Sequence, residues 1–221
     1  MRPFEEEFKL LNDTLQEMGS LVAHSIQRSV LSLVEKNEDY AHQVIRDESR
    51  VDQMEVQVDE KVTSLIVREQ PVARDMRLVV SAIKISTDLE RMGDLAVHIA
   101  ERALSLMTQP PLPEAVNFGE IANLVESMVL GSLDAFVKRD AQLARGILET
   151  DDAVDKARNG IQRQLTGLMQ RDATTVCRAL DYLIVARKLE RIADHATNIA
   201  EDVIFLTQGV DVRHQPAVEV A

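Results

Sequence analysis

Acidic residues spaced four apart are the groups in this chain that could do chemistry. They form four pairs: Glu48 and Asp52, Glu90 and Asp94, Asp151 and Asp155, and Glu190 and Asp194. In a helix, residues at this spacing lie on the same face, and like charges there destabilise the helix by roughly 0.2–0.5 kcal/mol per pair. Repeated repulsion of this kind predicts that a cation neutralises the carboxylates.

Divalent metal ions are the cations expected here, because hard ions such as Mg²⁺, Mn²⁺, Ca²⁺ and iron accept several carboxylate oxygens. Two pairs on neighbouring helices could present their carboxylates to one site. The first predicted site is Glu48, Asp52, Glu90 and Asp94, and the second is Asp151, Asp155, Glu190 and Asp194. Carboxylate ligation does not select a metal, so Mg, Mn, Fe and Zn all stay open. One isolated pair is usually a solvated helix face, and the repetition is what favours a metal.

The acidic pairs belong to an internal repeat. Residues 88 to 101 read DLERMGDLAVHIAE and residues 188 to 201 read KLERIADHATNIAE, which is a shift of 100 positions. Further upstream, apolar positions correspond to apolar positions at a shift of 103. The change in shift falls near residues 70 to 73, where a turn can readily lose residues. Two copies of one unit therefore account for nearly the whole chain.

Apolar residues at steps of three and four predict long amphipathic helices. The helices are expected at about residues 5 to 36, 39 to 69, 71 to 108, 118 to 138, 141 to 170 and 173 to 208. Asn37 to Asp39 offer a turn and an N-cap, Pro71 could begin a helix, and the prolines at 110, 111 and 113 mark a linker. The predicted fold is all-α, with two tandem, sequence-repeated three-helix bundles of long, mostly antiparallel helices. Their expected bounds are 1–109 and 114–208, followed by a loose tail at 209–221.

Charge and composition restrict the partners. The net charge of −12 opposes binding to nucleic-acid phosphates or anionic lipid, and Lys and Arg form no basic block. No apolar run approaches the roughly 20 residues that span a bilayer, and the acidic start is unlike a signal peptide. The protein is therefore expected in the cytoplasm. The single cysteine, Cys177, lies in an apolar stretch and is interpreted as a core residue rather than a nucleophile.

The acidic segments resemble those of a known family. The segments from Glu90 to Asp94 and from Glu190 to Asp194, the sequence QPVARDMR at residues 70 to 77, and the double three-helix layout are similar to the PhoU family of phosphate-uptake regulators. The resemblance spans about residues 4 to 207. It implies two similar bundles, frequently assembled as a homodimer, with carboxylate-bound metal clusters on the bundle surface in some members. The family's ligand motifs fall on the carboxylates of the two predicted sites.

The resemblance also implies a function. It is that of a negative regulator of phosphate uptake and of the phosphate-starvation response, acting as a cytoplasmic, non-enzymatic adaptor. The implied partners are the ATPase subunit of the phosphate ABC transporter and a membrane sensor histidine kinase. No catalytic residue and no organic cofactor site is predicted.

The two copies depart from each other in their outer acids. Glu55 and Asp59 extend the acidic face of the first copy, whereas Arg158 and Gln162 take the corresponding positions in the second. We therefore expect the two metal sites to differ in affinity or in number of ions, with the first site the more electronegative.

Two other classes of protein stay open at this point. A di-metal carboxylate enzyme built on a helical bundle usually draws on Glu-x-x-His pairs in the bundle core, and no Glu of this chain has a His three positions later. A metal-free structural helical protein is the second alternative, because solvated acidic helix faces are common.

Overall fold

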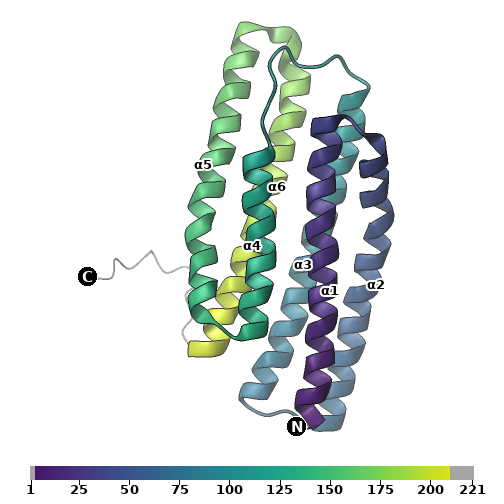
Figure 1. The fold of residues 1–221 in the computed structure, drawn as a ribbon, viewed down its shortest axis with the longest axis vertical. Helices are drawn as coiled ribbons and strands as arrows, with labels where there is room; N and C mark the ends of the chain where they lie inside the picture. Colours follow the sequence, from purple (N-terminus) through teal and green to yellow (C-terminus); the bar gives the residue numbers. More distant parts are fainter. Residues whose placement is uncertain (1–2, 210–221) are drawn as a thin grey trace, which may run out of the picture.

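The computed structural model describes residues 3–209, which fold into long helices joined by short connections (Figure 1). The helices are α1 (Pro3–Glu35), α2 (Glu38–Glu69), α3 (Arg74–Met107), α4 (Gly119–Lys138), α5 (Ala141–Arg171), the 3-10 turn η1 (Ala173–Thr175) and α6 (Val176–Gln208). The prediction of an all-α fold with two tandem three-helix bundles is confirmed. Of the predicted tail at 209–221, Gly209 is described, and the remainder lies outside the described residues, as do residues 1 and 2.

Side-chain caps explain where two of the helices begin. The Asn37 side chain accepts a hydrogen bond from the backbone amide of Asp39 at 2.9 Å, which starts α2 at the predicted turn. Asp140 accepts hydrogen bonds from the amides of Gln142 and Leu143 at the start of α5. These amides have no partner inside their helices, so the caps define both helix starts.

The predicted helix start at Pro71 is wrong, because α3 begins at Arg74. Gln70 and Ala73 both have positive φ angles, of 45° and 47°, which end α2 and turn the chain before α3. Residues other than glycine rarely adopt positive φ, so the residue types gave no signal for this turn. The sixth helix also starts later than residue 173, because the Asp172 side chain caps η1 and α6 follows from Val176.

The two bundles lie side by side (Figure 1). The first consists of α1, α2 and α3, and the second of α4, α5 and α6; α3 packs against α6 and α1 packs against α4 where the bundles meet. Among the described residues, the buried apolar side chains form one continuous cluster through both bundles. The bundles therefore share a core, which fixes α3 and α6 as the central helices.

Polar contacts also cross between α3 and α6. They join Lys84 to Asp202 at 3.0 Å, Arg102 to Asp181 at 3.0 Å, and His195 to Asp88 at 2.8 Å. Asp202 is 8% exposed, and a buried carboxylate is costly without a partner. The Lys84 ammonium therefore stabilises the contact between the bundles.

The proline-rich linker is tied to the second bundle. Arg178 of α6 donates hydrogen bonds to the carbonyl oxygens of Pro110 and Pro111, both at 2.8 Å. Arg171 at the end of α5 lies 2.6 Å from the carboxylate of Glu114. The hydrogen bonds from Arg178 satisfy carbonyl groups that the linker itself does not pair.

The interpretation of Cys177 as a core residue is wrong, since its side chain is exposed in the first turn of α6. The apolar stretch around it is wider than the stripe that α6 buries: Ala179 is buried, while Leu180 is 47% exposed. None of the described helices is long and apolar enough to cross a membrane.

Gly19 gives a test of the contact between α1 and α4. A Cβ atom added at Gly19 would overlap Leu133 Cδ1 of α4. We expect Gly19→Val to destabilise the protein by about 1–3 kcal/mol, because extra atoms in a packed interface force side chains out of place. The free energy of unfolding, measured by urea denaturation, checks this.

Two further variants locate the effect. Gly146→Val on α5 is the matched control, because a Cβ there meets nothing within 4 Å. In a Leu133→Ala background, Gly19→Val should lose much less stability than in the wild type, since the overlapping atoms are gone. Equal losses in both backgrounds would contradict the close approach of α1 and α4.

Candidate metal centre

The first acidic face consists of Glu48 and Asp52 on α2 and Glu90 and Asp94 on α3. The helices approach closely beside it, because a Cβ added at Gly93 would lie 3.3 Å from Val51 Cγ1. Val51 is buried, so the hydrophobic contact of α2 with α3 positions the neighbouring acids at the edge of the core. The two helices thereby direct their predicted ligands toward one patch.

The carboxylates of this face influence one another. Desolvation raises the pKa of Glu48, and the negative charges of Asp52, Asp94 and Glu101 raise it further. Desolvation also raises the pKa of Glu90, followed by repulsion from Asp94. Because Glu48 is on α2 and Asp94 is on α3, the repulsion acts between the helices as well as along them.

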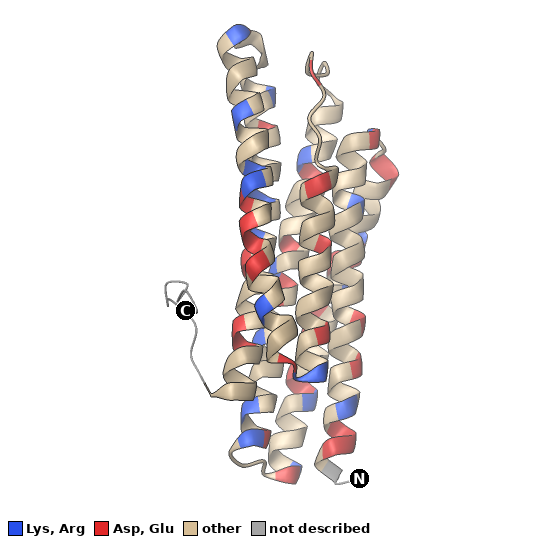
Figure 2. Cartoon of the chain, turned by 60° about the vertical axis from the view of Figure 1, so that its left-hand side comes forward, with Lys and Arg blue, Asp and Glu red and all other residues tan. Residues whose placement is uncertain are grey.

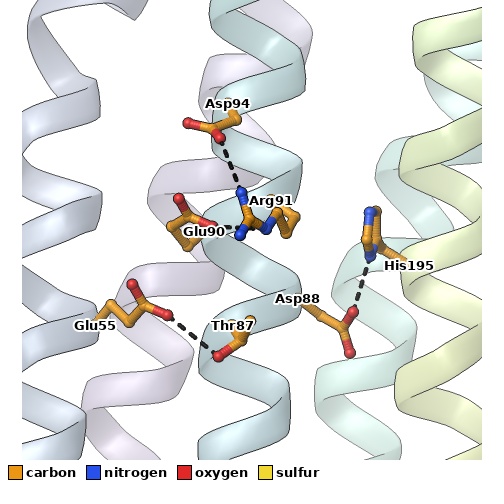
Figure 3. Close-up of polar contacts among 7 residues, drawn as sticks. All are labelled: Glu55, Thr87, Asp88, Glu90, Arg91, Asp94 and His195. Atoms are coloured by element: carbon orange, nitrogen blue, oxygen red, sulfur yellow. Dashed lines mark hydrogen bonds and ion pairs between the residues drawn. The ribbon is translucent and has the colours of Figure 1, made fainter.

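A surface arginine partly compensates the first acidic face. Arg91 Nε lies 3.4 Å from Glu90 and Arg91 Nη1 lies 3.6 Å from Asp94 (Figure 3), and the Arg91 side chain is 59% exposed. On the next turn toward the N-terminus of α3, Thr87 donates a hydrogen bond to Glu55 of α2 at 3.2 Å (Figure 3). Long contacts from an exposed arginine contribute little, so much of the negative charge is uncompensated by protein groups.

The second acidic face consists of Asp151 and Asp155 on α5 and Glu190 and Asp194 on α6. Desolvation raises the pKa of Asp151, and the charges of Asp194 and Asp155 raise it further. The pKa of Asp194 is raised by desolvation and by Glu190. The predicted acids of the second copy therefore also act on one another across a helix pair.

Arg158 is part of this second face, which the sequence analysis did not anticipate. It replaces an outer acid of the first copy, and its Nη2 lies 2.7 Å from Glu190 and 3.9 Å from Asp155. The shift of 103 placed it on the acidic face of α5, so the signal for the ion pair was present in the repeat alignment.

His98 and His195, which are close to predicted ligands in the sequence, lie in different parts of the structure. His98 is exposed, and its charge acts to lower the pKa of Glu48, so it lies near the first acidic face. His195 faces α3 instead, where its Nδ1 lies 2.8 Å from Asp88 (Figure 3). His195 therefore belongs to the contact between the bundles rather than to the acidic face of its neighbour Asp194.

The donor chemistry of both faces fits a hard divalent cation, because it consists of carboxylate oxygens. As the side chains lie, no group of three or more His, Cys, Asp or Glu within residues 3–209 is arranged to hold a metal ion. Ligation would require the carboxylates to change rotamer toward the ion. In the view of Figure 2, acidic and basic residues are interspersed along the helices. Metal binding at either face stays a prediction.

The fold and its duplicated acidic faces define a class of protein: an all-α chain made of two copies of one three-helix unit. The family model described as the PhoU domain matches residues 15–103 and 118–203, once in each bundle. The chain therefore belongs to the PhoU family, and the resemblance stated from the sequence is confirmed.

Several family members are similar over nearly the whole chain. A phosphate-specific transport system accessory protein PhoU homolog from Pseudomonas putida is 38% identical over 96% of this chain and 83% of its own length. A homolog of the same description from Aquifex aeolicus is 38% identical over 94% of this chain and 96% of its length. The match thus includes both bundles and the linker.

Solved structures agree with the fold. The crystal structure of PhoU from Pseudomonas aeruginosa has a TM-score of 0.89, is 36% identical, and covers 94% of this chain and 100% of its own. The phosphate transport system regulatory protein PhoU from Streptococcus pneumoniae has a TM-score of 0.85 and 26% identity, covering 95% of this chain and 99% of its own.

The raised pKa values predict how the stability of the metal-free protein depends on pH. A carboxyl group with a pKa higher in the folded state than in the unfolded state contributes stability below its unfolded pKa, and that contribution is lost as pH rises through the folded pKa. Glu48, Glu90, Asp151 and Asp194 are such groups. Their joint contribution to the free energy of unfolding should therefore fall as pH rises from about 4 through their folded pKa values.

Urea denaturation in chelator at a series of pH values measures this. Glu48→Gln combined with Asp151→Asn should weaken the decline, because both substitutions remove a repelled charge. Glu6→Gln combined with Asp13→Asn removes the same number of carboxyl groups from exposed positions of α1 and serves as the control. An unchanged pH dependence in the first variant would contradict mutual repulsion at the faces.

Proposed function

We propose that this chain is a negative regulator of phosphate uptake and of the phosphate-starvation response, acting as a non-enzymatic adaptor. The observation that supports this most directly is membership of the PhoU family over both bundles. The relatives are described as accessory or regulatory proteins of phosphate transport. A regulator of this type acts by binding other proteins, which agrees with long helical surfaces and acidic faces rather than a deep substrate site.

The proposed partners are the ATPase subunit of the phosphate ABC transporter and a membrane sensor histidine kinase. The adaptor is proposed to act in the cytoplasm as a homodimer, as the resemblance to the PhoU family implies. By contacting both partners, the adaptor couples the transporter to the kinase, so that the phosphate supply alters the activity of the kinase.

Divalent metal ions are proposed at both acidic faces. Support comes from carboxylates on neighbouring helices that raise one another's pKa, because such charges are stabilised by a shared cation. An oxygen-only donor set suits Mg²⁺, Mn²⁺, iron or zinc without selecting one. The alternative of a di-metal enzyme lacks the Glu-x-x-His pairs typical of that chemistry.

Divalent cation should raise the thermal stability of the protein. A ligand that binds the folded state alone stabilises it by about 2.7 kcal/mol at a hundredfold excess over its Kd. We expect millimolar Mn²⁺ to raise the Tm of the wild type, and chelator to reverse the change. Differential scanning calorimetry of the full chain measures both.

The site is tested by a matched pair of variants. Glu90→Gln with Asp94→Asn removes ligands from the first acidic face and should reduce the Mn²⁺-induced rise in Tm. Glu6→Gln with Asp13→Asn, remote from both faces on α1, should retain the full rise. A melting curve indifferent to Mn²⁺ in the wild type would exclude metal binding and favour the structural alternative.

Deletion of the gene in its host should make expression of starvation genes independent of phosphate. The physical reason is loss of the contact through which the transporter restrains the kinase. A reporter for a starvation-induced promoter, measured in phosphate-rich medium with and without a complementing copy, gives the readout. Normal repression in the deletion strain would remove the regulatory assignment.

Co-purification of membrane partners, with and without chelator, would test the role of metal.

A further inference from the structure

Arg158 distinguishes the two acidic faces of this protein. Under the shift of 103 it takes the place of Glu55, and Gln162 takes the place of Asp59. Compared with the first face, the second face therefore has a positive charge in place of one outer acid and a neutral amide in place of the other. Since the guanidinium of arginine stays protonated in proteins, this charge is present at every working pH.

The contacts of Arg158 hold its guanidinium among the carboxylates. Nη2 lies 2.7 Å from Glu190 and 3.9 Å from Asp155, while Nη1 donates to Asn159 at 2.7 Å and to Gln162 at 3.1 Å. The substituted Gln162 is thus one of the acceptors that orient the substituted Arg158. The two exchanged residues are therefore joined by a hydrogen bond in one arrangement.

The arginine that contacts the first face, Arg91, is held less closely than Arg158. Its side chain is 59% exposed and lies 3.4 Å from Glu90, whereas that of Arg158 is 23% exposed and lies 2.7 Å from Glu190. Short, partly buried ion pairs are stronger than exposed, long ones. The position that Arg158 occupies in the second copy is held in the first by Glu55, which accepts a hydrogen bond from Thr87 at 3.2 Å.

We infer that Arg158 is a built-in counter-ion of the second acidic face, which makes that face a weaker metal site than the first. Its guanidinium occupies an oxygen of Glu190 and repels an approaching cation. The first face, with Glu55 in the corresponding place, is the stronger of the two proposed metal sites. This inference rests on the proposed binding of metal at the acidic faces.

Calorimetric titration of the full chain with Mn²⁺ tests the inference. In a background with Asp52→Asn and Asp94→Asn, which disables the first face, Arg158→Gln should tighten Mn²⁺ binding at the second face by about tenfold, the scale on which groups around metal ligands change affinity. Arg163→Gln is the control, since it removes one positive charge from an exposed position of the same helix. It should leave the affinity close to that of the background.

A reciprocal variant gives an independent measurement if Arg158→Gln does not fold. In a background with Asp155→Asn and Asp194→Asn, Glu55→Arg should weaken Mn²⁺ binding at the first face by about tenfold, and Gln57→Arg on the exposed side of α2 is its control. Gln57→Arg should have little effect, because its charge lies away from the ligands.

The outcomes separate the inference from the function on which it rests. If the wild type binds Mn²⁺ but Arg158→Gln and Glu55→Arg behave like their controls, the role of Arg158 is overturned and the metal site stands. If neither the wild type nor any variant binds Mn²⁺, the proposed metal site and the role of Arg158 are both overturned.

Discussion

The constraint that shapes this protein is that hydrophobic packing holds like charges together. Val51 packs beside Gly93 between α2 and α3, and the acids of the first face lie next to this contact. Burying one such valine stabilises the fold by about 1.5–3 kcal/mol, which exceeds the few tenths of a kcal/mol lost to one pair of repelling carboxylates. The helices therefore stay together despite the repulsion, which a bound cation would relieve.

Duplication repeats the helices but not the polar contacts between the bundles. Lys84 pairs with Asp202, yet the positions corresponding to them at a shift of 100 are Ile184 and Arg102, and Arg102 pairs with Asp181 instead. The contact of His195 with Asp88 likewise has no counterpart, because Leu95 and Lys188 stand at the corresponding positions. Each half therefore contributes different charges to the α3 and α6 contact. These charge contacts favour one relative placement of the two bundles.

The sequence predicted the fold well because long helices with regular apolar periods are specified locally. The start of α2 followed from the cap at Asn37, but the start of α3 did not, since the residue type of Ala73 does not signal its positive φ. The prediction that Cys177 is a core residue was wrong because the apolar stretch around it is wider than the stripe that α6 buries. Such a stretch does not indicate which of its residues are exposed to solvent. The acids of both faces were identified from spacing, whereas the ion pair of Arg158 depends on the position of α6 beside α5.

On the proposal that the first face binds metal, the two faces relieve the repulsion of their carboxylates in two ways, and these respond to different conditions. An arginine side chain is covalently attached, so its local concentration at the second face does not change with conditions. A metal ion is held by mass action, so its occupancy follows its concentration and competes with protons for the same carboxylates. On this proposal the contribution of Arg158 to the second bundle is constant, whereas the stability of the first bundle varies with the concentration of metal. Because both bundles share one core, with α3 packed against α6, we expect metal at the first face to affect the stability of the whole molecule.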